Sequence, residues 1–73
     1  MKLTSTSFHQ SGDNPAVLYS YDNGALLGWE FAEGIWIEAP APELFRKGEL
    51  LSKVAFERRF ENIGMPPVEE DAA

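Results

Sequence analysis

The 73-residue sequence contains no cysteine, which excludes disulfide bonds and thiolate metal sites and leaves packing as the source of stability. It has one histidine, His9, with no second metal ligand at a suitable spacing. It also lacks the run of about 18 apolar residues that a membrane helix needs. The polar N-terminus has no apolar core of a signal peptide. We therefore expect a soluble, cytoplasmic protein without a metal or other cofactor.

Residue patterns typical of enzymes are also missing. Ser7 and Ser11 flank His9 without a supporting acid, and the glycines form neither a phosphate-binding loop nor a dinucleotide-binding fingerprint. Glu30 and Glu38 could oppose each other across two strands, as the carboxylates of a glycosidase do. A sheet of three strands cannot easily enclose a substrate cleft, however. We expect a protein that is not an enzyme.

The charge is acidic overall and unevenly distributed. Residues 1–45 carry six acidic side chains and one basic one, whereas residues 46–64 carry three acidic and five basic ones. Three further acids lie in residues 65–73, and the net charge is -6. Nucleic-acid binding depends on a dominant cationic surface, which this chain lacks. The distribution favours a protein partner over direct binding of nucleic acid. The acidic side chains are also too sparse for the chain to mimic DNA.

Three segments have the β-branched and aromatic content of strands: residues 16–21, 25–31 and 35–38. Asn23-Gly24 predicts a type I′ hairpin turn between the first two, and residues 32–34 predict a second turn. These features indicate a three-stranded antiparallel meander. Residues 3–10 are rich in serine and threonine and predict either an N-terminal edge strand or a frayed arm.

The second half of the chain predicts helical structure. Pro40 and Pro42 end the sheet, and residues 43–46 can form one helical turn. Residues 49–62 contain neither glycine nor proline and predict one long helix that ends before Gly64. We expect an α+β fold in which the meander packs against one C-terminal helix. Residues 1–64 form a single small domain in this prediction, and residues 65–73 a disordered acidic tail.

The alternation of side chains along strands predicts which residues share a face. Five apolar side chains are expected on the face that the helix covers: Leu27, Trp29, Phe31, Ile35 and Ile37. Glu30, Trp36 and Glu38 then lie on the opposite, open face, where an aromatic ring among carboxylates suits an apolar, basic peptide. The alternative is that Trp36 belongs to the core, beneath Leu3 or Phe8.

The predicted helix has two apolar stripes where one is enough to pack on a sheet. The first contains Leu50, Leu51, Val54 and Ala55, and the second contains Phe56, Phe60 and Ile63. Arg59 projects between the stripes. The second stripe is either covered by the N-terminal arm and the 43–46 turn, or it binds a partner through Phe56, Arg59 and Phe60.

Two segments, YSYDNGALLGWEFAEGIWIE and LLSKVAFERRFENIG, together with the size and acidity of the chain, resemble the small RNA polymerase-binding regulators of lytic Xanthomonas phages. The resemblance implies a phage protein of host takeover that binds host bacterial RNA polymerase, through its largest subunit and not through DNA. It implies inhibition of transcription initiation, with antitermination as a second effect, by a chain that is monomeric when free. Two alternatives stay open: an inhibitor of another host complex such as a CRISPR effector, and a structural module that self-associates through Phe56 and Phe60.

Overall fold

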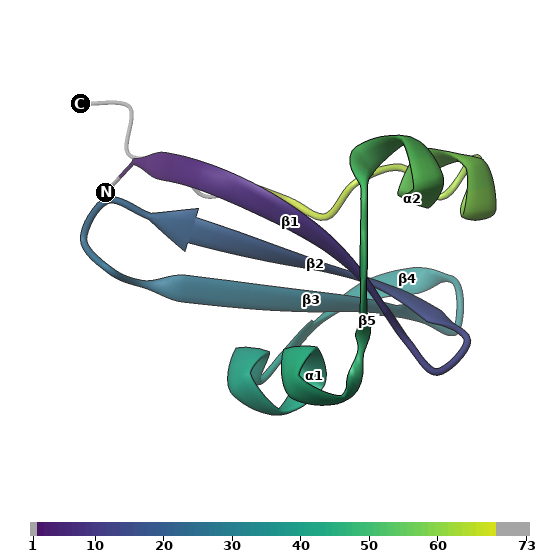
Figure 1. Ribbon diagram of the computed structural model, residues 1–73, viewed down its shortest axis with the longest axis horizontal. Coiled ribbons are helices and arrows are strands. Elements are labelled where there is room, and N and C mark those ends of the chain that lie inside the picture. Colours follow the sequence, from purple (N-terminus) through teal and green to yellow (C-terminus); the bar gives the residue numbers. More distant parts are fainter. Residues whose placement is uncertain (1, 69–73) are drawn as a thin grey trace.

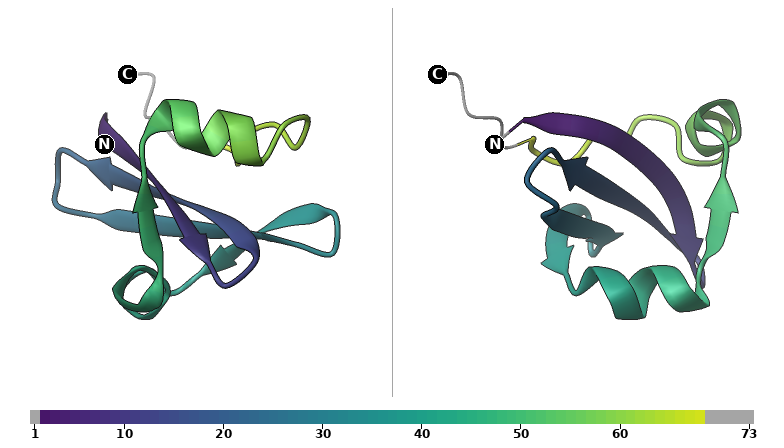
Figure 2. Two further views of the ribbon diagram at one scale, coloured as in Figure 1. Left: turned by 45° about the vertical axis from the view of Figure 1, so that its right-hand side comes forward. Right: turned by 60° about the vertical axis from the view of Figure 1, so that its left-hand side comes forward.

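The computed structural model describes residues 2–68, without the side chains of Glu43, Leu44 and Lys47. In chain order the elements are β1 (Leu3–Ser11), β2 (Asn14–Tyr21), β3 (Leu26–Ala32), β4 (Ile35–Ala39), α1 (Ala41–Lys47), β5 (Glu49–Leu51) and α2 (Lys53–Arg59). The strands form one antiparallel sheet in the order β4-β3-β2-β1-β5. The helices lie on opposite sides of this sheet, and β5 runs between them (Figure 1; Figure 2).

The α+β class and the antiparallel meander of β2, β3 and β4 are confirmed, but the sheet has five strands and not three. The N-terminal segment is a full strand of nine residues, β1, of which only residues 8–10 have a neighbouring strand on both sides. It pairs with β2 on one side and with β5 on the other, with Phe8 opposite both Val17 and Leu51. The serines and threonines at positions 4–7 lie in the part of β1 that pairs with β2 alone, as the predicted edge strand would.

The long helix predicted for residues 49–62 is wrong at both ends, because α2 spans only Lys53–Arg59. Residues 49–51 form β5, which pairs with β1, and the helix begins only after Ser52. The Ser52 side chain accepts a hydrogen bond of 3.1 Å from the Ala55 N–H, which is the bond that an N-terminal cap makes. The two apolar stripes are explained by this break, because Leu50 and Leu51 belong to a strand and Phe56 to a helix.

The two turns of the meander differ from the predicted ones. Gly24 donates to the Tyr21 carbonyl and has a φ of 85°, whereas Asn23 is not left-handed. This geometry is a three-residue loop that ends in a left-handed glycine, so the type I′ turn predicted at Asn23-Gly24 is wrong. The next turn has only two central residues, Glu33 and Gly34, and both have positive φ, 56° and 83°.

The core lies on one face of the sheet, beneath α2. Its buried members are Val17, Tyr19, Tyr21, Leu51 and Phe56. The Phe56 ring centroid lies 4.9 Å from that of Phe8 and 5.3 Å from that of Phe60. Aromatic rings bury a large apolar area per residue, so they contribute strongly to the core of a domain of this size.

The other face of the sheet is covered by α1, which is longer than the single turn predicted for residues 43–46. The Phe45 ring packs edge-on against His9, with 4.3 Å between ring centroids. Gly28 allows this approach, because a Cβ there would lie 2.9 Å from Phe45 Cε2 and 3.0 Å from the Ala39 carbonyl oxygen. A glycine in the middle of β3 thus makes room for α1.

The segment after α2 turns back along the sheet. Gly64 has a φ of 71°, and Pro66 is buried, with its carbonyl accepting a hydrogen bond from the Tyr19 hydroxyl. Residues 69–73 of the predicted acidic tail lie outside the described residues. Within residues 2–68, neither helix has the length and apolar character needed to cross a membrane.

Candidate functional site

The predicted binding face of Glu30, Trp36 and Glu38 is divided between the two faces of the sheet. The two-residue turn pairs Ala32 with Ile35, which puts Trp36 opposite Phe31 and Glu38 opposite Trp29. Side chains of directly paired residues share a face. Trp36 and Glu38 therefore lie on the core side, and Glu30 lies on the other side, opposite Ile37.

The prediction that Ile35 and Ile37 join the core face is also wrong, for the same reason. A shift of one residue in pairing moves every side chain of a strand to the opposite face. Ile35 is 60% exposed and Ile37 is 43% exposed. Two β-branched apolar side chains are thus presented to solvent beside the carboxylate of Glu30.

Trp36 packs against the core, as the alternative prediction held, although it lies beside Phe31 and not beneath the N-terminal strand. Its ring meets Phe31 edge-on with 5.2 Å between centroids, and the side chain is half-buried. The indole Nε1 is buried and has no hydrogen-bond partner among residues 2–68. An unpaired buried donor has a desolvation cost, which reduces the net contribution of this indole to stability.

We call the exposed side chains along the β3–β4 hairpin the hairpin surface: Glu30, Glu33, Ile35, Ile37 and Glu38. Glu33, Ile35, Ile37 and Glu38 are exposed, and Glu30 is half-buried. No lysine or arginine occurs anywhere in the sequence between Lys2 and Arg46. The hairpin surface therefore combines apolar area with a negative potential that no basic neighbour in sequence offsets.

The second predicted group, Phe56, Arg59 and Phe60, has a mainly structural role in the described chain. Phe56 is 2% exposed, and Phe60 is half-buried against it. Arg59 is exposed and donates from Nη1 to Gln10 Oε1 at 2.8 Å and to Glu49 Oε2 at 3.3 Å. It thereby joins α2 to β1 and β5. The stripe is largely interior, and only the rim of Phe60 reaches the surface.

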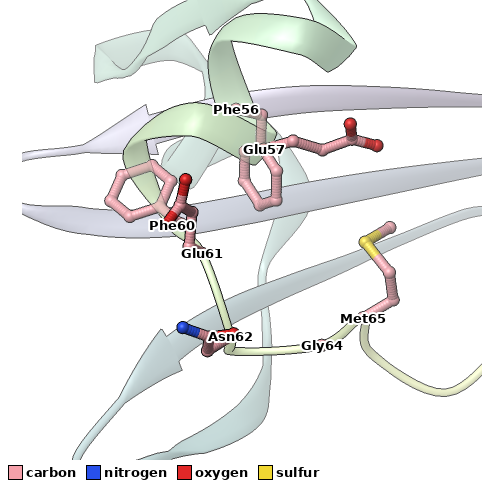
Figure 3. Close-up of a pocket in the computed structure, with 7 residues that line it drawn as sticks. All are labelled: Phe56, Glu57, Phe60, Glu61, Asn62, Gly64 and Met65. Carbon is pink, nitrogen blue, oxygen red and sulfur yellow. The ribbon is translucent and has the colours of Figure 1, made fainter.

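A shallow groove lies beside Phe60 and was not predicted. It has a volume of about 390 Å³ and is lined by Phe56, Glu57, Phe60, Glu61, Asn62, Gly64 and Met65. Figure 3 shows the two phenylalanine rings on one side of the groove and Met65 on the other. A second groove of about 540 Å³ shares Glu57 and Met65 and extends along β1 past Thr6 and Phe8. The segment after Gly64 supplies one wall of each groove opposite residues of α2 and β1, so the grooves depend on tertiary contacts that no local sequence pattern predicts.

His9 is the remaining candidate for chemistry, and its surroundings do not supply a reacting partner. Its side chain is 9% exposed, Nε2 lies 2.9 Å from the Ser7 hydroxyl, and burial lowers the imidazole pKa below its usual 6.5. Nδ1 is buried without a partner in the described part of the chain. No group of three potential metal-ligating side chains occurs in residues 2–68.

Comparison with known proteins adds no constraint on the site. No family model matches the chain, and neither a curated protein nor a solved structure was found to match it.

Proposed function

We propose that this chain is a phage protein that binds host bacterial RNA polymerase in the cytoplasm and inhibits transcription initiation by protein–protein contact, without enzymatic activity. The observation that carries the proposal is the hairpin surface, where Ile35 and Ile37 are exposed beside Glu30 on one face of the hairpin and Glu38 is exposed on the other face. Adjacent apolar side chains that are exposed and rimmed by polar ones are a feature of interaction sites. The glutamates of the hairpin surface favour a partner that carries basic side chains.

A basic protein segment fits this surface better than a nucleic acid does. Carboxylates repel phosphates, and residues 3–45 contribute six acidic and no basic side chains. A partner with lysines or arginines around an apolar centre meets complementary charge at the rim and apolar contact at the middle. Complementary charges raise the association rate, and the buried apolar contact lowers the dissociation rate.

The identity of the partner comes from the resemblance of residues 19–38 and 50–64 to the phage RNA polymerase-binding regulators. On this basis the contact is made to the largest subunit of the polymerase, and antitermination is a second effect of the same contact. Self-association through Phe56 and Phe60 is less favoured, because Phe56 is almost fully buried within one chain.

The test is retention of purified bacterial RNA polymerase holoenzyme by the immobilised chain, combined with promoter-dependent run-off transcription. The variant Glu33→Lys/Glu38→Lys alters the hairpin surface. The matched control Glu57→Lys/Glu61→Lys makes the same change in net charge on α2 and the residues after it.

We expect the hairpin variant to lose binding and inhibition by about tenfold or more, which corresponds to about 1.4 kcal/mol, and the control to keep both. Polymerase retained no better than by a bare matrix contradicts the function. Equal loss in both variants contradicts the assignment to the hairpin surface.

A further inference from the structure

The outer edge of β4 is an unoccupied pairing edge in residues 2–68. β4 is the terminal strand of the sheet and pairs only with β3. The main contacts of α1, the helix that follows β4, are with β3 and β1, so this helix packs on the face of the sheet. Open edges offer a row of main-chain donors and acceptors to another strand.

The turn at Glu33 and Gly34 determines which main-chain groups point outward. In a two-residue hairpin, the residues that flank the turn exchange hydrogen bonds, and the pairs then alternate between bonded and non-bonded. Ile35 and Ile37, opposite Ala32 and Glu30, therefore point their N–H and C=O groups toward β3. Trp36 and Glu38 stand at the non-bonded positions, so their N–H and C=O groups point away from the sheet.

The side chains on this edge also alternate in chemistry. Ile35 and Ile37 lie on one face, and Trp36 and Glu38 lie on the other. An added strand would place every second side chain beside the isoleucines and the others beside Glu38. The matching sequence therefore has apolar residues at alternate positions and basic residues between them.

Charge decides between a foreign strand and a second copy of this chain. Pairing of two β4 edges would bring the glutamates of both hairpins, Glu30, Glu33 and Glu38 from each copy, into one small region. Like charges directly opposite across strands are destabilising, and exposed charge on an edge strand opposes self-pairing. The same carboxylates attract a basic strand.

We propose that the outer edge of β4 binds an extended, basic peptide segment of a protein partner by strand addition, through main-chain hydrogen bonds to Trp36 and Glu38. The inference deepens the proposed function, because it assigns a binding mode to the same hairpin surface. In strand addition the main chain supplies the affinity and alternate side chains supply the specificity. β4 has five residues and is followed by Pro40, so the paired segment is about as short as β4 itself.

The first test uses a ten-residue peptide that alternates valine and lysine as the probe, with amide hydrogen exchange of this chain followed by NMR. We expect the amides of Trp36 and Glu38 to exchange rapidly in the free chain and to become protected when the peptide is added. The amides of Ile35 and Ile37 are expected to be protected in both states. Protection of all four only in the complex, or no new protection at saturation, overturns strand addition.

The second test separates main-chain pairing from charge at one position. Glu38→Pro removes the outward N–H, and Glu38→Gln removes only the charge. The proline is compatible with the fold because Glu38 makes no ladder hydrogen bond through its N–H and already follows an extended residue. We expect Glu38→Pro to weaken peptide binding about fivefold or more beyond the effect of Glu38→Gln, since one hydrogen bond is lost. Equal weakening in the two folded variants overturns the main-chain contact.

A peptide that alternates valine and glutamate, and sedimentation of the free chain, complete the design. Equal affinity for the glutamate peptide overturns the choice of a basic strand, and a dimer that Glu38→Pro abolishes overturns it in favour of a second copy.

Purified RNA polymerase distinguishes this inference from the proposed function. Amide protection by the lysine peptide without polymerase retention supports strand addition and contradicts the polymerase target. Polymerase retained equally by Glu38→Pro and Glu38→Gln, without amide protection by the lysine peptide, supports the polymerase target and contradicts strand addition.

Discussion

The hydroxyl of Tyr19 donates a hydrogen bond of 2.8 Å to the carbonyl oxygen of Pro66, which joins the centre of β2 to the segment that follows α2. Tyr19 is among the two largest side chains that are fully buried, and Pro66 is buried as well. Tyr21, two residues along the same strand, is also buried, but its hydroxyl has no partner in residues 2–68. The two tyrosines thus differ in one interaction.

The substitution Tyr19→Phe is expected to lower the free energy of unfolding by about 1–3 kcal/mol, because the Pro66 carbonyl is left buried without a donor. The same substitution at Tyr21 removes a hydroxyl that has no partner and is expected to be neutral or stabilising. Urea unfolding followed by tryptophan fluorescence measures both. Equal losses in the two variants would mean that the Tyr19–Pro66 bond contributes nothing to stability.

Stability is expected to fall as the pH falls below the usual histidine range, because burial lowers the pKa of His9 in the folded chain. The unfolded state then binds the proton first, so the stabilisation is complete above about pH 6.5 and declines as the pH falls toward the folded-state pKa. Four neighbours of His9 in the described part of the chain carry no charge: Ser7, Ala16, Phe45 and Leu50.

The measurement is the urea midpoint of the wild type and of His9→Gln at pH 7.5 and pH 5.5. We expect the free energy of unfolding of the wild type to fall by up to about 1 kcal/mol more than that of the variant from pH 7.5 to pH 5.5, since one pH unit of linked protonation is worth about 1.4 kcal/mol. Parallel curves for the two chains would refute the assignment to His9.

Ser52→Ala is expected to destabilise the protein by about 1 kcal/mol, because the Ala55 N–H loses the side-chain acceptor that caps α2. Ser52→Asp keeps an acceptor at the same place and should keep most of the stability. Thermal unfolding followed by circular dichroism compares the three chains. If the aspartate variant is as unstable as the alanine variant, the cap is not what begins the helix.

Gly28→Ala is expected to cost about 1–3 kcal/mol, because the new methyl group overpacks the contact between β3 and α1. It would lie 2.9 Å from Phe45 Cε2 and 3.2 Å from Ala41 Cα. In a Phe45→Leu background the cost should be smaller, and a double-mutant cycle measures the difference. Costs that are identical in both backgrounds would show that Phe45 is not the obstacle.

The strands of the meander are predictable from sequence, but their register is not. The sequence predicts a turn over residues 32–34, which would place Phe31 opposite Ile35. The structure places Glu33 itself in the left-handed region, which a glutamate seldom occupies, so the turn has two residues. That difference of one residue moves Trp36 toward the core and exposes Ile35 and Ile37, which is why the candidate site could not be assembled from the pattern alone.

The predicted start of the helix at residue 49 is wrong for a different reason. Glu49, Leu50 and Leu51 have good helix propensity, and local preference extends the helix back to residue 49. Pairing with β1 overrides that preference, since Leu51 gains a buried place opposite Phe8. Ser52 is a residue type that favours the N-cap position, and it marks the start of α2, which helix propensity alone did not predict.

The position of β5 has a consequence for the order of assembly. Strands β1 to β4 are joined by short turns and can pair as successive hairpins while the chain is still being made. β5 pairs Leu51 with Phe8, which lie far apart in the sequence, and this contact closes the longest loop in the sheet. Contacts with such a large separation in sequence form late. Weakening them should therefore accelerate unfolding and leave the folding rate nearly unchanged.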